Sequence, residues 1–240
     1  MNMYKLKSQI LSEYKYKIEL HAHTFPASGC SEISPKVLVE TYKKLDYDAV
    51  TVTNHFVWDK NACKEEYIDR FLNDFYETQK HGNDLGLKVY LGAEVRFTEN
   101  GNDYLVFGVD KKMLEEIYDF LPYGVENLRK NCDMKSSVFI QAHPMRNGME
   151  MIDTDLLDGI EVYNMHPNHN SRVGLAALYA KKENISIITA GSDFHHANQN
   201  HEGLAALRVS QLPNDSFELA NLIKEQNYFL EIGRRTILFP

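Results

Sequence analysis

Short apolar segments rich in β-branched and aromatic residues recur along the chain, and this pattern predicts strands. Eight such segments are present: YKIELHAH (16–23), DAVTVTNH (48–55), LKVYLGAEVRF (87–97), YLVFGV (104–109), SVFIQAH (137–143), GIEVYN (159–164), ISIITAGSD (185–193) and YFLEIG (228–233). Between many of them, apolar residues at helical spacing predict helices over 35–45, 64–80, 111–121, 169–184 and 215–227. Ser34 and Pro35 are typical of an N-cap followed by a first helical residue.

The alternation of strands and helices predicts a parallel sheet with helical crossovers. Near-continuous apolar runs such as DAVTVT and ISIITA suit strands that are covered on both faces. About seven such units favour a closed barrel over an open sheet, and no glycine-rich phosphate loop follows the first strand. We therefore expect an α/β fold, a TIM-like barrel, in a single domain covering residues 1–240.

Composition narrows the function classes. The formal net charge of −8 argues against a protein that coats nucleic acid, because affinity for the phosphate backbone comes from Lys and Arg. No signal-like or membrane-spanning apolar run is found, so we expect a cytoplasmic protein without a membrane partner. The three cysteines, Cys30, Cys63 and Cys132, are widely spaced, which predicts reduced thiols and neither a disulfide framework nor a thiolate zinc site.

Histidines and carboxylates stand at or just beyond the carboxyl ends of several predicted strands: His21, His23, His55, Glu94, His143, Asp193 and His195. Residues two apart on a strand point to one face, so His21 and His23 can reach the same metal. The His-Ala-His spacing alone is weak evidence, but ligands repeated at the end where barrel enzymes assemble their sites favour a shared metal centre. Such donors suit Zn, Mn or Fe better than Mg or Ca.

Five motifs in order, ELHAHT, TVTNH, GAEV, QAHP and GSDFH, resemble those of the polymerase-and-histidinol-phosphatase (PHP) family, over residues 16–205. The resemblance implies a distorted (β/α)7 barrel, two or three divalent transition metals at its C-terminal face, and usually phosphoester hydrolysis. It places His21, His23, Glu94 and Asp193 on one metal. Glu94 would bridge to a second metal held by His143 and, on a looser alignment, by Asp103. His55 and His195 would hold a third.

Two departures from the family pattern put the third site in doubt. Ser28 lies where the family commonly has Asp, so a carboxylate is missing. Asn54 replaces the Asp that usually precedes His55, so no charge orients that imidazole. Whether all three sites fill is left open.

The catalytic group implied by the resemblance is Glu94, His143, Asp193 and His195. Arg146 is a candidate for binding phosphate oxygens in a fork, although an exposed surface arginine is an equal alternative. Asn164, His169 and Arg172 are candidates for lining the substrate pocket, against a plain loop and helix start capped by Asn168.

The main function hypothesis is hydrolysis of a small phosphorylated metabolite or nucleotide. The alternatives are a nuclease or proofreading module, a metal-binding protein that has lost turnover, and a metal hydrolase that cuts C–N or C–O bonds.

Overall fold

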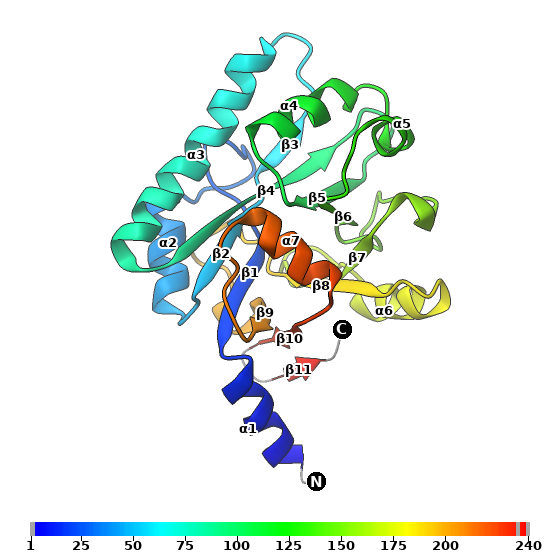
Figure 1. Ribbon diagram of the computed structural model, residues 1–240. Coiled ribbons are helices and arrows are strands. Elements are labelled where there is room, and N and C mark those ends of the chain that lie inside the picture. Colours follow the sequence, from blue (N-terminus) through cyan, green and yellow to red (C-terminus); the bar gives the residue numbers. More distant parts are fainter. Residues whose placement is uncertain (1–2, 234–235, 239–240) are drawn as a thin grey trace.

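The computed structural model describes residues 3–233 and 236–238. Its strands are β1 (Tyr16–Ala22), β2 (Ala49–Val52), β3 (His55–Val57), β4 (Lys88–Arg96), β5 (Asp103–Phe107), β6 (Val138–Gln141), β7 (Gly159–Asn164), β8 (Ile187–Gly191), β9 (Ala205–Val209), β10 (Phe229–Ile232) and β11 (Thr236–Leu238). Its α-helices are α1 (Met3–Glu13), α2 (Pro35–Lys44), α3 (Lys64–Leu85), α4 (Lys111–Phe120), α5 (Val125–Asn131), α6 (Val173–Lys182) and α7 (Ser216–Lys224). Figure 1 shows α1 extending away from the body that the other elements form.

The strands form one sheet in the order β11-β10-β9-β1-β2-β4-β5-β6-β7-β8, with β3 paired to the far end of β4. The sheet curls, because Phe194, just beyond β8, pairs with Ala22 at the end of β1. Phe194 donates a backbone hydrogen bond to His21 and accepts one from His23. The carboxyl ends of β1 and β8 therefore meet, and the chain is a mixed α/β domain around a curled sheet.

A regular series of parallel β/α units, as expected for a (β/α)7 barrel, is not found in the part of the chain that the structure describes. β5 runs antiparallel to both β4 and β6. Residues 97–102 connect β4 to β5, and this stretch is too short for a crossover, which needs a dozen residues or more. β9, β10 and β11 are also joined to their neighbours in antiparallel fashion. The sheet thus has two parallel parts, β1-β2-β4 and β6-β7-β8, which are joined through the antiparallel strand β5. The antiparallel strands β9, β10 and β11 extend the sheet beyond β1.

Several element boundaries differ from the prediction for local reasons. The segment 48–55 is divided into β2 and β3, with Thr53 and Asn54 between them. Helix α3 continues to Leu85 and ends where Gly86 adopts a left-handed backbone at φ 68°. Helix α6 begins only at Val173, so Asn168 does not cap it. By contrast, Ser34 caps α2 as predicted and accepts a hydrogen bond from Val37 N.

Apolar residues of β1, β5 and β6, among them Leu20, Leu105 and Ile140, share one buried cluster that also includes residues of α7. Helix α3 packs on α2 and β4 (Figure 1). None of the helices in the described ranges is both long and apolar enough to cross a membrane. The packed framework leaves the polar residues at the carboxyl ends of β1, β4, β6 and β8 facing one another.

Candidate metal centre

Ionisable side chains gather where these strands end, and most of them are fully buried. The exposed fractions of His21, Glu94 and Asp193 are 0%, 1% and 2%. Burial of a charged group is costly unless it has partners of opposite charge or a metal. His143 (φ 30°) and Asp193 (φ 49°) both adopt the left-handed backbone region, a strained conformation that occurs at functional sites.

The first group of candidate ligands surrounds His21 and His23. His21 Nε2 lies 3.1 Å from His23 Nε2, and both nitrogens face the same two carboxylates. The distances from His21 Nε2 are 3.2 Å to Glu94 Oε1 and 3.5 Å to Asp193 Oδ1. From His23 Nε2 they are 3.3 Å to Glu94 Oε2 and 3.4 Å to Asp193 Oδ1. Two imidazole nitrogens and two carboxylates aimed at one point match the donor set of a first-row metal.

The partners of the other ring nitrogens establish which tautomers are present. His21 Nδ1 lies 2.8 Å from Glu161 Oε1, and an ionised carboxylate only accepts, so Nδ1 carries the hydrogen. His23 Nδ1 lies 3.1 Å from Ser28 Oγ, whose own hydrogen goes to Asn54 Oδ1 at 2.9 Å. In the neutral rings, both Nε2 atoms then carry a lone pair that points into the cluster. Histidines that bind metals are held in this way by acceptors behind them.

Glu161 comes from β7 and lies outside the ligand group. Its Oε2 accepts hydrogen bonds from His143 N (3.1 Å) and Asn164 Nδ2 (2.9 Å). Burial opposes ionisation, but the neighbouring His21 outweighs it and lowers the pKa of Glu161. A Cβ at Gly191 would overlap both Glu161 and His21, so only glycine allows β8 to approach this pair.

The second group joins Glu94, Asp103 and His143. His143 Nε2 lies 3.1 Å from Glu94 Oε1 and 3.9 Å from Asp103 Oδ2. His143 Nδ1 is buried and has no hydrogen-bond partner within residues 3–233 and 236–238. Asp103 lies at the predicted place, but Arg96 Nε and an Arg96 terminal nitrogen each bind one of its oxygens at 2.7 Å. The free Nδ1 of His143 is a position where a cation or a water molecule could bind. Asp103 is shared with Arg96, a residue that the sequence analysis did not identify.

The third group contains a residue that was not expected. Ligand atoms of His23, Cys30, His55 and His195 all lie within 4.8 Å of one another. Cys30 Sγ is 3.2 Å from His195 Nε2. Burial opposes ionisation of the thiol, but hydrogen bonds with His195 and His55 outweigh it and lower the pKa of Cys30 to about 6. The sequence predicted reduced thiols and no thiolate zinc site, and the structure places one of these free thiols among candidate ligands, because the loop after β1 folds back onto the end of β8.

The two departures from the family pattern have structural roles. Ser28 Oγ accepts from His23 Nδ1 and His55 N, so it orients the first group of ligands. Asn54 Oδ1 accepts from Thr24 N at 2.7 Å as well as from Ser28, and therefore holds the loop after β1 rather than the His55 ring. Glu19 was also missed. It is buried, binds His21 N and Ser192 N at 2.9 Å each and thereby ties β1 to β8.

The histidines and carboxylates of the cluster shift one another's pKa values strongly. Burial raises the pKa of Glu94, but the charges of His21 and His55 outweigh it and hold that pKa well below its usual range. Burial and the neighbouring His195 lower the pKa of His23 to about 3. Burial also opposes the charge of His21, but the surrounding carboxylates outweigh it and raise the pKa of that residue. Divalent cations compete with protons for such donors, so metal binding at this cluster would release protons.

The predicted substrate-binding residues do not all lie at the ligand cluster. Arg146 lies in the cluster, with one terminal nitrogen 2.6 Å from Asp193 Oδ2 and 2.8 Å from Asn164 Oδ1. His169 is exposed, and its ring packs at 4.4 Å between centroids on His166, which in turn faces His195. Arg172 is exposed and donates to Met145 O and Asn147 Oδ1 in the loop after β6. These contacts of Arg172 lie within that loop and not in the ligand cluster.

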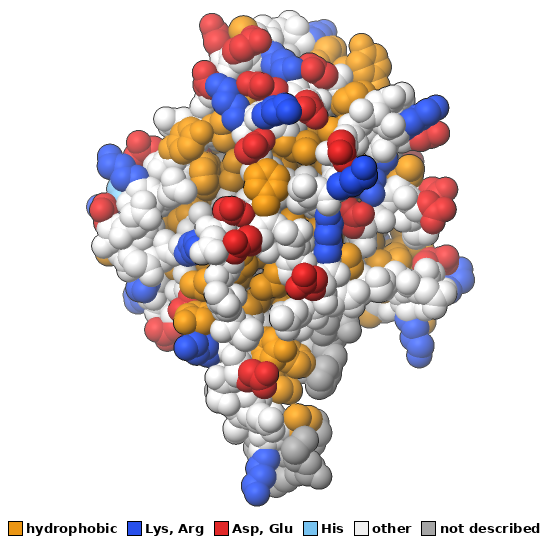
Figure 2. All heavy atoms as spheres, viewed as in Figure 1, with side chains coloured by type: hydrophobic (Ala, Val, Ile, Leu, Met, Phe, Trp, Pro, Cys, Tyr) orange, Lys and Arg blue, Asp and Glu red, His pale blue; other side chains and the backbone are white. Residues whose placement is uncertain are grey.

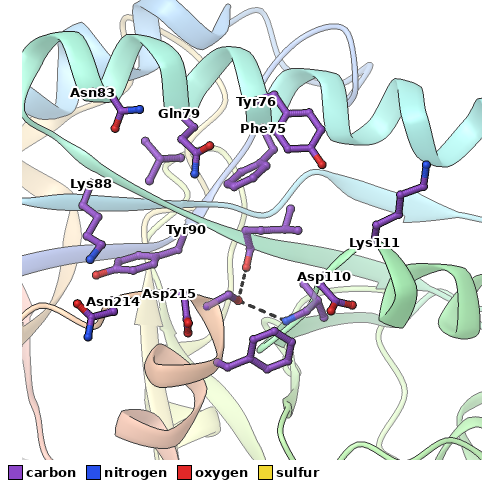
Figure 3. A pocket seen from close by; sticks show the side chains of 15 residues that line it. Phe75, Tyr76, Gln79, Asn83, Lys88, Tyr90, Asp110, Lys111, Asn214 and Asp215 are labelled. Atoms are coloured by element: carbon purple, nitrogen blue, oxygen red, sulfur yellow. Dashed lines mark hydrogen bonds between the residues drawn. The ribbon is translucent and has the colours of Figure 1, made fainter.

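A pocket of about 400 Å³ lies elsewhere, between α3, the start of β4 and the N-termini of α4 and α7 (Figure 3). Ser216 Oγ, at its wall, donates to Leu91 O and accepts from Val109 N. Asp110 and Asp215 cap their helices, and Tyr90 donates to Pro213 O. Because these polar groups already bind the protein, we place the chemistry in the ligand cluster and not in this pocket.

Comparison with known proteins identifies the family. The PHP domain model matches residues 19–235. A DNA polymerase III of the PolC type from Oceanobacillus iheyensis is 24% identical over 142 residues, which is 59% of this chain and 9% of the polymerase. The match therefore spans about a tenth of that protein's length.

Solved structures with similar folds have low sequence identity. A two-domain protein from Bacteroides vulgatus, containing a predicted PHP-like metal-dependent phosphoesterase, has a TM-score of 0.62 at 13% identity and covers 91% of this chain and 65% of its own. PsfC from Pseudomonas syringae has a TM-score of 0.55 at 17% identity, covering 94% and 91%. An amidohydrolase from Chromobacterium violaceum, with bound sulfate and no metal, has a TM-score of 0.52 at 14% identity, covering 75% and 88%.

These likenesses concern the fold, whereas the family match extends over most of the sequence and includes every motif on which the resemblance was based. The chain belongs to the PHP domain family.

Proposed function

We propose that the protein is a metal-dependent hydrolase of phosphate esters that acts on a small phosphorylated metabolite or nucleotide. The observation that carries the proposal is the position of Glu94 between histidines on both sides. Its Oε1 lies 3.2 Å from His21 Nε2 and 3.1 Å from His143 Nε2, whereas its Oε2 lies 3.3 Å from His23 Nε2. A carboxylate shared in this way is suited to bridge two cations, and paired cations are a recurrent device for phosphoryl chemistry.

The family and the fold support this proposal. The Bacteroides vulgatus protein is described as containing a PHP-like phosphoesterase. The meeting of Ala22 and Phe194 supports a distorted barrel whose ligands lie at the carboxyl ends of its strands. Cations of Zn, Mn or Fe suit the histidine and carboxylate donors, with two positions served by Glu94 and a third near His55 and His195.

In the proposed mechanism, Glu94, His143, Asp193 and His195 would hold the cations. Bound cations would supply Lewis acidity and lower the pKa of a water molecule so that it can attack phosphorus. Two or three divalent charges would exceed the charge of the carboxylates of Glu94, Asp103 and Asp193, so the loaded site would attract a phosphate dianion. Arg146 stands beside Asp193 at the edge of the cluster, and its guanidinium can turn to bind phosphate oxygens in a fork. Asn164 and His169 lie next to the same space.

A nuclease or proofreading role is the second candidate, and the match to the DNA polymerase is the observation that favours it. The net charge of −8 weighs against it. On the face of the molecule in Figure 2, acidic and basic side chains are interspersed and no basic stripe is visible. A small substrate is therefore the better candidate, and a salt-dependent affinity for DNA would reverse this preference.

The experiment that tests the proposal is hydrolysis of a generic aryl phosphate by the purified protein loaded with Mn or Zn, with and without a chelator. We expect phosphate release that the chelator abolishes. His143→Ala should lower kcat/KM at least about 100-fold, since it removes a ligand and not only an outer partner. His81→Ala, a histidine on α3, is the matched control and should keep full activity. Full turnover by His143→Ala would refute the two-cation mechanism.

If the metal-loaded protein releases no phosphate from any ester, the remaining hypotheses are a hydrolase for C–N or C–O bonds and a binding protein without turnover. An amide substrate panel distinguishes these two, because only the former gives a product.

A further inference from the structure

Cys30 stands in the loop between β1 and α2, two residues beyond Ser28, and reaches the part of the cluster that lacks a carboxylate. Its thiol is grouped with nitrogens of His55 and His195. Cys30 is solvent-exposed on its outer side, whereas His195 is buried. The thiol thus forms the outer border of a small polar space whose inner wall consists of imidazoles.

The hydrogen bonds of His195 establish which of its nitrogens faces the thiol. His195 Nδ1 lies 2.9 Å from the backbone carbonyl of Asp193, which can only accept, so Nδ1 carries the hydrogen. In the neutral ring Nε2 is then a lone pair, and it lies 3.2 Å from Cys30 Sγ. A nitrogen lone pair and a sulfur at this separation either share the thiol hydrogen or bind one cation together.

His55 provides a second imidazole beside the thiol. Its Nδ1 is buried and has no hydrogen-bond partner among the described residues, although it lies 3.2 Å from Glu94 Oε2. The His55 ring therefore spans the space between Glu94 and Cys30. Since Nδ1 faces Glu94, the other ring nitrogen, Nε2, is the one on the side of the thiol.

We propose that Cys30, as a thiolate, completes a third cation site together with His55 and His195. This inference rests on the proposed metal centre and deepens it, because it assigns a ligand to the site whose usual carboxylate is replaced by Ser28. A donor set of two imidazoles and one thiolate is softer than the carboxylate-containing sets around Glu94, and it favours Zn or Co over Mn or Mg. The thiolate is the form of cysteine that binds metals.

The test is a titration of the metal-free protein with Co(II), followed by absorption. A thiolate ligand gives a charge-transfer band in the near ultraviolet that imidazole and carboxylate ligands lack. We expect the band in the natural protein and in Cys63→Ser, the control for an exposed cysteine outside the cluster. Cys30→Ser should abolish the band and weaken binding of one cation more than about 100-fold, because even partners outside the ligand group contribute 10–100-fold. Cys30→Asp should restore binding without the band.

A second measurement needs no variant. Zn should protect Cys30 against alkylation by iodoacetamide and leave the rate at Cys63 unchanged, as read from peptide masses. A band that persists in Cys30→Ser, or equal alkylation of Cys30 with and without Zn, would overturn the proposal. Both readouts are independent of turnover, so absence of phosphate release would count against the proposed function alone.

Discussion

The replacement of Glu161 by Gln removes one charge at nearly constant volume, and the hydrogen bonds around this side chain predict a large effect. All the groups that contact its two oxygens are donors. Oε1 faces His21 Nδ1, and Oε2 faces His143 N and Asn164 Nδ2. A carboxylate accepts all three hydrogens, whereas an amide presents two hydrogens of its own on one side.

Both orientations of the amide are unfavourable. With its nitrogen in place of Oε2, the donors from His143 and Asn164 lose their acceptor, which costs about 1–3 kcal/mol each. The total of about 2–6 kcal/mol lowers the melting temperature by at least roughly 4 °C for a domain of this size. With its nitrogen in place of Oε1, the amide donates toward His21 Nδ1. The ring then moves its hydrogen to Nε2, and that hydrogen occupies the position of a metal ligand.

We therefore expect Glu161→Gln to melt at lower temperature without metal, and to bind Zn about 10–100-fold more weakly than the natural protein. Competition with a chromophoric chelator measures the affinity, and scanning fluorimetry measures melting. The matched control is Glu32→Gln, since Glu32 lies 3.3 Å from His196 but is 79% exposed, and such a pair contributes little. If Glu161→Gln melts and binds Zn like the natural protein, the reasoning from donors and acceptors is wrong.

Three further predictions concern the metals, the substrate and pH. Removal of metal by a chelator should lower the melting temperature. A site occupied at a free metal concentration of 100 times its Kd adds about 2.7 kcal/mol to the free energy of unfolding, which corresponds to roughly 5–11 °C per site. An unchanged transition in scanning fluorimetry would contradict metal binding. Arg146→Ala should raise KM for an aryl phosphate at least about 10-fold, and unchanged KM and kcat would exclude a phosphate contact. Burial lowers the pKa of His166 to about 4, below its ordinary 6.5, and its Nδ1 accepts from Asn168 N. The stability that this contributes is fully present above pH 6.5 and is lost as the pH falls toward 4. His166→Asn should therefore lose less stability than the natural protein between pH 7 and pH 5 in urea unfolding, and equal losses would show that His166 is not the titrating group.

Local patterns predicted much of the framework because they depend on neighbours in the chain. Ser34 and Pro35 predicted the start of α2, and the apolar runs at 159–164 and 185–193 predicted β7 and β8. The antiparallel course of β5 was not predicted, since strand direction depends on the path of the connection and on pairing with distant strands. Helices α1 and α5 and strands β9 and β11 were not predicted from their local sequences at all.

The chemistry shows the same division. The sequence by itself determined the family and the main candidate ligands, because most of these ligands lie at or just beyond the carboxyl end of an apolar strand, and the ends of neighbouring strands meet at one edge of a sheet. Only the tertiary structure decided which atoms meet. It placed Cys30 beside His195, 165 positions away in the chain, paired Arg96 with Asp103, and directed Arg172 to another loop. The physical reason is that contacts between side chains from distant loops depend on backbone turns and on curling of the sheet, which residue spacing does not record.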